Sequence, residues 1–346
     1  MHFASDNTGP THPKVLEAVM RASEGYAMPY GNDPWNEEAV AQIRETFEAP
    51  EATVYFAATG TGANSMALGA MTAPWAAIFC HEMAHVLIDE SHGPTFFAGG
   101  ASFAAVGGIS GKMSPDALRG TIEKYAPGDI HTPERGPLTI TNVTEAGTVY
   151  TLAEIDALVA EAKAVGMPVH LDGARFANAC AALGCTAAEM SWKRGIDAVT
   201  FGGTKNGCMS VEAVIFFDPT YAEAFKRQRM RAGHLFSKHR VLSAQMAVYA
   251  DGLWLELAEQ ANGAARRLIE GLHALPHVEF VHKPASNLMF CRMPRRLHVH
   301  AHQQGAEFYS FADTEAGDPD EPIVARFVVD WSATDENTDR FLDILA

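Results

Sequence analysis

Short apolar segments alternate with stretches of helical periodicity through the first two thirds of the chain. Most of these segments are apolar at consecutive positions, as is typical of strands covered on both faces. They are residues 53–57, 76–80, 102–106, 138–143, 169–172, 198–202 and 213–218. Helices are predicted between them, for example at residues 61–71, 115–125, 152–165 and 174–183. The alternation predicts an α/β fold with a mostly parallel central sheet and helices on both sides.

The pattern changes after residue 218. Two long helical stretches without strand signals follow, at residues 221–232 and 237–275. Beyond them, short strands are expected at residues 278–281, 288–291 and 323–329, and a last helix at 334–345. The acidic segment 313–322 is rich in Pro and Gly, which predicts an exposed loop. We therefore expect a large domain over residues 1–250, including the N-terminal segment, and a smaller α+β domain over residues 251–346.

Charge and cysteine usage narrow the choice of partners. The 346 residues carry a net charge of −16, which argues against nucleic acid and anionic membranes as partners. The start of the chain has no basic run followed by an apolar stretch, and no apolar run approaches the roughly 18 to 20 residues of a membrane span. The five cysteines are scattered and form no disulfide framework. We expect a cytoplasmic protein with reduced thiols.

Two of the predicted strands end in residues that can carry chemistry. The strand at 169–172 ends in Asp172, whose simplest interpretation in isolation is a helix cap. The strand at 198–202 leads into the sequence GGTKNG, which contains Lys205. An isolated loop lysine is usually a solvated charge, but flanking glycines allow a ligand to approach the backbone closely. A partly desolvated lysine has a lowered pKa and can form a Schiff base.

A glycine-rich turn follows the strand at 53–57 and opens a helix. Its sequence, ATGTGAN at residues 58–64, offers free backbone N–H groups and a helix dipole to a phosphate. It matches neither the P-loop nor the dinucleotide-binding fingerprint, and a simple tight turn would explain it in isolation. Because ligands of open α/β sheets bind at the carboxyl ends of the strands, the three features should converge. A phosphate cradle, an aspartate and a Schiff-base lysine are what pyridoxal 5′-phosphate (PLP) needs.

The chain resembles the low-specificity L-threonine aldolase family, within the β-eliminating-lyase group of fold type I PLP enzymes. The resemblance spans nearly the whole chain, and its most specific parts are DGARFANACAALGC and FGGTKNG. The matching segments are residues 3–7, 30–33, 59–65, 84–85, 129–131, 171–178, 201–207 and 325–327. It implies PLP as cofactor and the retro-aldol cleavage of L-threonine, L-allo-threonine or related substrates such as phenylserine to glycine and an aldehyde.

The resemblance also implies how the cofactor is held. Lys205 would carry it as a Schiff base, and Asp172 would pair with the pyridine nitrogen so that the ring acts as an electron sink. Gly60 and Thr61 would hold the phosphate. His85 would stack on the ring and is a candidate base for the β-hydroxyl proton.

Further residues are implied in cofactor and substrate binding. Thr204 and Arg175 would contact the cofactor, and Arg175 would also bind the substrate carboxylate together with Ser5 and Arg326. Arginine suits bidentate carboxylate recognition, although two arginines without this motif context would be interpreted as surface ion pairs. His131 would contact the substrate hydroxyl, directly or through a water that serves as the base.

Assembly is implied by the resemblance alone. We expect a homodimer or homotetramer in which Tyr30 reaches the substrate site across an interface. The family often has a basic residue near the cofactor phosphate in the segment that corresponds to residues 227–233. Here Arg227, Arg229 and Arg231 all compete for that match, so the sequence leaves the register open.

Three alternatives remain beside this interpretation. Residues 81–85 read His-Glu-Met-Ala-His, the H-E-x-x-H signature of zinc hydrolases, but the motif follows a strand directly and lacks a third ligand. We expect no metal. Another PLP reaction, such as β-elimination, racemisation or transamination, would use the same cofactor motifs. A protein that binds PLP without turnover would also keep them.

Overall fold

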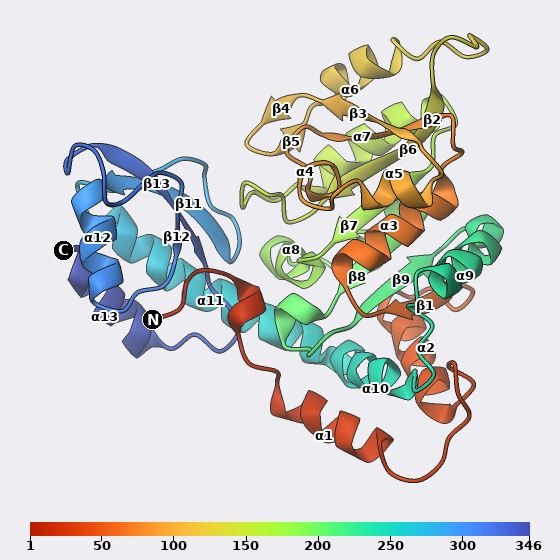
Figure 1. The fold of residues 1–346 in the computed structure, drawn as a ribbon, viewed down its shortest axis with the longest axis horizontal. Coiled ribbons are helices and arrows are strands. Elements are labelled where there is room, and N and C mark those ends of the chain that lie inside the picture. Colours follow the sequence, from red (N-terminus) through yellow and green to blue (C-terminus); the bar gives the residue numbers. More distant parts are fainter.

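A seven-stranded sheet forms the centre of the larger half of the molecule (Figure 1). In the computed structural model, which describes residues 1–346, the strand order is β1-β9-β8-β7-β6-β2-β3. The strands are Thr53–Ala57 (β1), Ala76–His81 (β2), Ser102–Val106 (β3), Glu134–Thr141 (β6), Val169–Gly173 (β7), Ala198–Gly202 (β8) and Glu212–Phe216 (β9). β9 runs antiparallel to both neighbours, whereas the other pairs are parallel. The predicted α/β fold with a mostly parallel sheet is confirmed.

Helices connect these strands and cover the sheet. The strands β2, β7, β8 and β9 are buried at every position, which requires cover on both faces. The helices of this half are Pro13–Ala22 (α1), Pro34–Thr46 (α2), Gly60–Met71 (α3), His85–Ile88 (α4), Gly93–Phe97 (α5), Pro115–Ile122 (α6), Leu152–Ala164 (α7), Phe176–Leu183 (α8), Ala222–Arg231 (α9) and Arg240–Val248 (α10). A short hairpin pairs Gly108–Ile109 (β4) with Lys112–Met113 (β5).

A smaller antiparallel sheet with the order β10-β11-β13-β12 forms the other half. Its strands are Glu279–Phe280 (β10), Leu288–Pro294 (β11), Tyr309–Ser310 (β12) and Pro322–Val328 (β13). Helices Arg295–Gln303 (α12) and Asp335–Leu345 (α13) lie on the side away from the central sheet (Figure 1). The acidic segment 313–322 forms an irregular and mostly exposed connection, as predicted.

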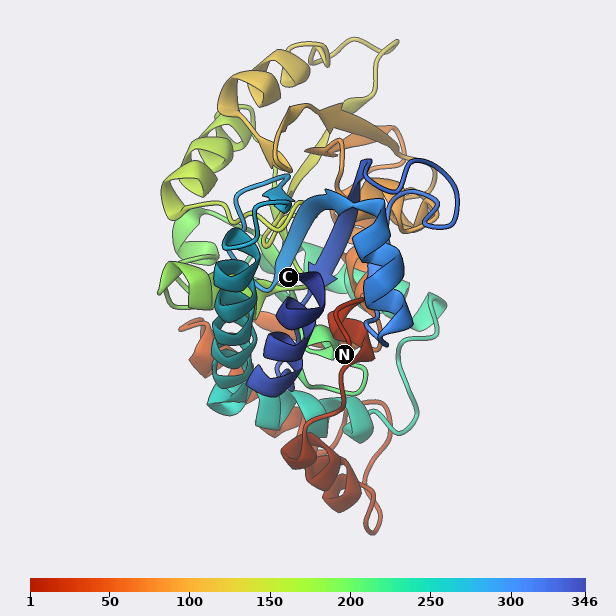
Figure 2. The ribbon, with the colours of Figure 1, turned by 90° about the vertical axis from the view of Figure 1, so that its left-hand side faces the viewer.

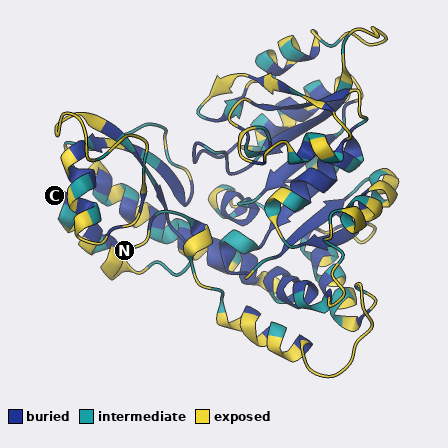
Figure 3. Cartoon of the chain, in the orientation of Figure 1, coloured by how far each residue is buried: buried dark blue, intermediate teal, exposed yellow.

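Helix Trp254–His273 (α11) joins the two halves. Its first turns pack Leu257 into the main core, and its later turns pack Leu268 into a second core under the smaller sheet. Figure 3 shows buried residues along both sheets. We propose that the two cores mark the two domains that the sequence predicts. Phe3 joins the second core, 4.7 Å from the ring of Phe341, so the N-terminus lies beside α13 (Figure 2).

The predicted helical stretch at residues 237–275 is interrupted. Between α10 and α11, residues Tyr249–Leu253 form a wider turn in which Asp251 and Gly252 leave helical geometry. Gly252 has a φ of 80°, which costs little at glycine and breaks the axis at this point. No helix of the structure has both the length and the apolar character that crossing a membrane requires.

Candidate active site

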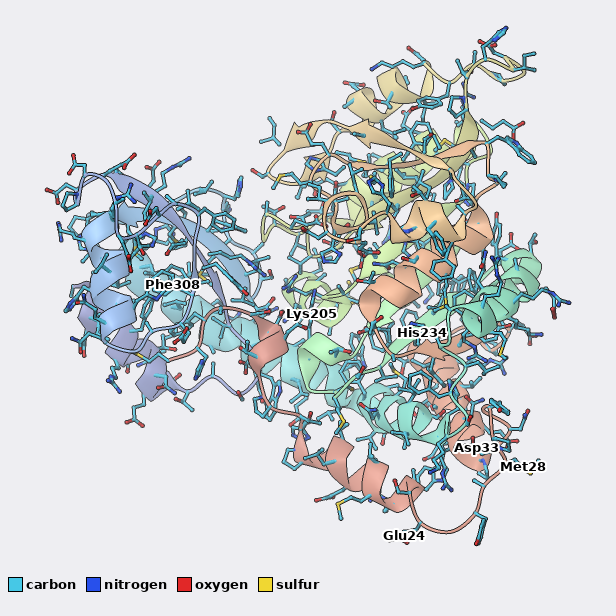
Figure 4. All side chains as sticks on the ribbon, viewed as in Figure 1. Glu24, Met28, Asp33, Lys205, His234 and Phe308 are labelled. Atoms are coloured by element: carbon cyan, nitrogen blue, oxygen red, sulfur yellow. The ribbon has the colours of Figure 1, made fainter.

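A cavity of about 290 Å³ opens at the carboxyl edge of the central sheet. Six predicted site residues line it, namely Gly60, Thr61, His85, Asp172, Thr204 and Lys205. They come from the end of β7 and from the segments that follow β1, β2 and β8, which are brought to one edge because these four strands point the same way. Figure 4 shows Lys205 in the centre of the molecule, between the two halves.

Lys205 lies in the short turn Thr204–Asn206 that directly follows β8. Burial and the nearby Arg175 guanidinium lower the pKa of its ammonium group. Three carboxylates act in the opposite direction, those of Asp6, Asp172 and Glu212. A lowered pKa increases the neutral fraction of the amine, which is the form that attacks a carbonyl carbon.

Asp172, the next-to-last residue of β7, is a buried carboxylate with 1% of its surface exposed. Its Oδ2 accepts a hydrogen bond from Nδ2 of Asn64 at 3.0 Å, and its Oδ1 accepts the N–H of Ala174 at 3.1 Å. The second bond closes a local turn and is no helix cap, because α8 begins at Phe176 with Arg175 at its N-cap position and has no side-chain cap. The first bond holds the carboxylate from α3, at the wall of the cavity that contains Lys205.

The N-terminus of α3 forms part of the cavity wall. Thr59 caps the helix through its Oγ1, which accepts the N–H of Gly62 at 3.1 Å. A Cβ on Gly60 would meet no atom within 4 Å, so the approach to the first turn is open. A Cβ on Gly62 would lie 2.4 Å from the ring of His234, which explains a glycine at that position. An anion here would face free N–H groups and the positive end of the helix dipole.

His234 was not predicted as part of this cradle. Its Nδ1 accepts the N–H of Ala58 at 3.1 Å, immediately before the first turn of α3. Burial lowers the pKa of the imidazole, so the neutral ring is favoured. Figure 4 shows His234 on the right of Lys205. The sequence alone does not indicate that His234 contacts this turn, because 171 residues lie between Gly62 and His234.

His85 begins α4 and is held at two points. Its Nδ1 lies 2.9 Å from Oε1 of Glu90, and its backbone N–H donates to Oε1 of Glu145 at 2.7 Å. The hydrogen bond with Glu90 is the largest cause that raises the pKa of His85. The Glu90 side chain is fully buried, and burial raises the pKa of its carboxyl group. Nδ2 of Asn64 also donates to Oε1 of Glu90, at 3.0 Å, which links Glu90 to the aspartate network.

Glu212 is a second buried carboxylate that the sequence interpretation missed. As the first residue of the antiparallel β9, it lies beside the carboxyl end of β8, opposite Gly202. Its oxygens accept the Gly203 N–H at 3.0 Å and the Thr204 hydroxyl at 2.7 Å. Burial raises its pKa to about 7. A single carboxylate at the start of an apolar strand was the available signal, but it could not reveal that β9 runs backwards.

The two predicted carboxylate-binding arginines differ in their partners. Arg175 is paired with Asp6 through two hydrogen bonds, of 2.6 Å and 3.0 Å, and only 9% of its side chain is exposed. Arg326, on β13, forms no ion pair within the chain and lies 5.6 Å from the ring centre of Tyr309. Burial and the proximity of Arg175 lower the pKa of Arg326. The guanidinium without a carboxylate partner is therefore that of Arg326, whereas Arg175 already forms an ion pair with Asp6.

Five predicted residues do not line the cavity of this chain: the two arginines, and also Ser5, Tyr30 and His131. Ser5 caps the turn Asp6–Thr8, and Asn7 lines the cavity in its place. Tyr30 is 47% exposed in the loop before α2. His131 is exposed before β6, at the amino end of this eight-residue strand, whereas the cavity lies at the carboxyl end. Within one chain, roughly 25 Å of strand separates His131 from that edge.

The arginine segment at residues 227–231 does not reach the cavity either. Arg227 and Arg231 are exposed, whereas Arg229 is partly buried, with its guanidinium 5.0 Å from the ring centre of Tyr55. Burial lowers the pKa of Arg229 to about 10. Of the three candidates, only Arg229 packs against the central sheet.

The H-E-x-x-H motif lacks the geometry of a zinc hydrolase. His81 is the last residue of β2 and His85 the first residue of α4, so the two rings do not share the face of one helix. Nδ1 of His81 accepts the N–H of Met83 at 3.1 Å. No group of three or more metal-binding side chains is assembled in the structure.

The donor set of the cavity fits one class of cofactor. It offers the Lys205 amine with its lowered pKa and the Asp172 carboxylate, which accepts two hydrogen bonds and can accept another. It also offers the open N-terminus of α3 to an anion. Asn64 Oδ1 and Glu90 Oε2 are buried without a partner, as expected in a site that awaits a polar group. The fold and the cavity thus define a protein built to hold a phosphorylated pyridine aldehyde at the edge of an α/β sheet.

Comparison with known proteins identifies the family. The family model described as beta-eliminating lyase matches residues 2–294, and the chain belongs to that family. It is 39% identical over 330 residues to a low specificity L-threonine aldolase of Pseudomonas aeruginosa, covering 95% of this chain and 92% of the relative. A similar protein of another Pseudomonas strain is 38% identical with the same coverage.

Solved structures agree with this assignment. A threonine aldolase of Leishmania major superposes with a TM-score of 0.92 at 26% identity, covering 99% of this chain and 98% of its own. A serine palmitoyltransferase of Sphingomonas wittichii has a TM-score of 0.74 at 14% identity, covering 100% of this chain and 86% of its own, which shows the fold alone. The chain has the fold type I architecture.

Proposed function

We propose that this protein is a PLP-dependent lyase that cleaves L-threonine, L-allo-threonine and related β-hydroxy-α-amino acids to glycine and an aldehyde. One observation carries the proposal: Lys205, with its lowered pKa, shares a cavity with Asp172 and the open N-terminus of α3. The family and the named relatives support the same reaction. The lysine that would carry the cofactor and the helix end that would bind its phosphate line the same cavity, which supports the proposal.

The residues that would hold the cofactor have distinct roles. Lys205 would bind the aldehyde carbon through Nζ, Asp172 would accept a hydrogen bond from the ring nitrogen, and Gly60 with Thr61 would bind the phosphate. When bound, PLP supplies an electron-poor ring that stabilises the negative charge left at the substrate Cα. Thr204 would support this arrangement, because its hydroxyl is anchored by Glu212 beside Lys205.

Substrate orientation would depend on the arginines. Arg326 has no carboxylate partner within the chain and would bind the substrate carboxylate. Arg175, which is fixed by Asp6, would add positive charge beside the substrate carboxylate and keep the cofactor site and the substrate site aligned. Fixing the carboxylate would orient the substrate so that its Cα–Cβ bond is held ready for cleavage.

His85 would move the proton of the β-hydroxyl group. Its Nδ1 faces the Glu90 carboxylate, so Nδ1 carries the hydrogen and Nε2 keeps its lone pair when the ring is neutral. Nε2 would then accept the proton directly or through one water. General-base assistance of this kind contributes about 10²- to 10⁴-fold in rate. A water held by His131 remains the alternative base.

Assembly and location complete the proposal. A homodimer or homotetramer would allow Tyr30 and His131, which are exposed in one chain, to approach the site of a neighbouring copy. A cytoplasmic location is supported by five cysteines without disulfide bonds.

The test combines absorbance with product analysis. Purified protein should show visible absorbance from the bound cofactor and release aldehyde and glycine from L-threonine, L-allo-threonine and phenylserine. Lys205→Ala should lose both the absorbance of the lysine-bound cofactor and nearly all turnover. Lys124→Ala, at an exposed lysine far from the cavity, is the matched control. A Lys205→Ala protein that cleaved threonine at the normal rate would refute the assignment, and keto-acid formation would point to an aminotransferase.

A further inference from the structure

The C-terminal end of α8 brings two cysteines together. Gly184 adopts the left-handed conformation with a φ of 64°, and its N–H donates to the carbonyl oxygen of Cys180 at 2.8 Å. The N–H of Cys185 donates to the same oxygen at 3.3 Å. In this type of helix end, the residue after the left-handed glycine contacts the helix residue five positions earlier. Here both of those positions are cysteines.

The two thiols form a pair with unequal exposure. Cys180 is fully buried, whereas Cys185 is partly exposed. The backbone bond keeps the two Cα atoms within roughly 7 Å, the range that a disulfide spans. Both residues line a surface cavity of about 650 Å³, through which small molecules can reach Cys185.

The remaining cysteines have a different environment. Cys80, Cys208 and Cys291 are buried, and burial raises the pKa of each thiol, to about 12 for Cys80 and Cys291. Cys180 is buried as well, which raises the pKa of its thiol, whereas Cys185 is the one cysteine that is partly exposed. Because a thiol reacts where a reagent can reach it, Cys185 is the accessible thiol of the chain, and a second thiol lies beside it.

We propose that Cys185 and Cys180 form a dithiol site that neutral peroxides oxidise to an intramolecular disulfide. The Cys185 thiolate attacks one peroxide oxygen, the O–O bond breaks, and the departing oxygen leaves as water, so that Cys185 becomes a sulfenic acid. The Cys180 sulfur then attacks Cys185, the S–S bond forms, and the S–O bond breaks with loss of a second water. Two thiols and one hydrogen peroxide thus give one disulfide and two waters.

The charge of the cavity selects the class of oxidant. Four carboxylates line it, those of Glu45, Glu48, Asp251 and Glu259, whereas no lysine or arginine does. A negative lining repels anions, so glutathione disulfide should react more slowly than hydrogen peroxide or a neutral hydroperoxide. The site is separate from the proposed catalytic cavity, and its oxidation is measurable whether or not the protein cleaves threonine.

The experiment uses the full chain and intact-mass spectrometry. Equimolar hydrogen peroxide should remove about 2 Da, reversibly with dithiothreitol, and peptide mapping should place the bond between Cys180 and Cys185. Cys185→Ser should abolish this change. Cys180→Ser should stop at the sulfenic acid, which adds about 16 Da and reacts with dimedone. Cys291→Ser, which removes a thiol outside the pair, should still form the bond.

A second measurement needs no variant. In the native protein, a small alkylating agent should modify Cys185 at least tenfold faster than Cys80, Cys208 or Cys291. Charge selection predicts that hydrogen peroxide outpaces glutathione disulfide at equal concentration. The proposal is overturned if peroxide leaves the mass unchanged, if the bond forms elsewhere, or if Cys185 is alkylated no faster than the buried cysteines.

Discussion

The carboxyl edge of the central sheet and the loop at residues 24–33 are opposite in character. At the edge, Asp172 and Glu212 are almost fully buried and held by hydrogen bonds. In the loop, apolar side chains face solvent: Tyr26 is fully exposed, and Met28 is 67% exposed. Figure 4 shows Met28 far from Lys205. The contrast teaches that one chain assembles the buried carboxylates of the cavity by itself, whereas the exposed apolar side chains of the loop form a surface of the kind that binding partners cover.

The largest effect is expected at the sheet edge. Asp172→Asn removes the negative charge that the ring nitrogen would meet, so kcat should fall about 10²- to 10³-fold with retained cofactor absorbance. Asp197→Asn is the matched control, because Asp197 accepts the N–H of Val169 at the other end of β7. The control should change thermal stability but leave kcat within about twofold. Equal losses of kcat in both variants would contradict the assigned role of Asp172.

Replacing each arginine in turn should separate an effect on substrate binding from an effect on protein stability. Arg326→Lys removes bidentate carboxylate recognition and should raise KM about 10- to 100-fold without lowering the melting temperature. Arg175→Lys breaks the buried pair with Asp6 and should lower the melting temperature as well. Steady-state kinetics and thermal unfolding measure the two effects. A normal KM in Arg326→Lys would remove this arginine from the substrate site.

A mixing experiment tests whether the exposed loops act on a neighbouring copy. His131→Ala should lower activity about tenfold, the value of one lost hydrogen bond to the substrate. If His131 serves the partner's site, subunits of His131→Ala and Lys205→Ala, unfolded and refolded together, should recover roughly a quarter of the native activity. This is because half of the dimers then contain one intact site. Activity no higher than that of the diluted His131→Ala protein would exclude a role across the interface.

The smallest effect is expected in the pH profile. Glu90 raises the pKa of His85, and a base must be neutral, so activity should fall as the pH drops through that pKa. Glu90→Gln removes the charge, lowers the pKa of His85 and should move the acid limb of kcat/KM to lower pH by roughly one unit. Glu145→Gln keeps an acceptor for the His85 backbone N–H and should leave the limb in place. An unshifted limb in Glu90→Gln would show that His85 does not set it.

Much of the fold followed from local pattern. The run of buried positions in β7 and β8 is visible in the sequence, and so is the Gly-rich turn before α3, because both depend on neighbours along the chain. Helix α4 has only four residues and gives no periodicity to detect. The break at Gly252 was also missed, because the apolar pattern continues on both sides of it.

The sequence by itself determined which groups could perform the chemistry: a lysine after a buried strand, an aspartate at the end of another, and a glycine-rich helix start. Only the tertiary structure decided which other side chains surround these groups. It placed Glu90 and Asn64 behind His85, turned β9 so that Glu212 reached the same edge, and paired Arg175 rather than Arg326 with Asp6. Strand direction and ion pairing depend on contacts between residues far apart in the chain, and local periodicity contains no record of them.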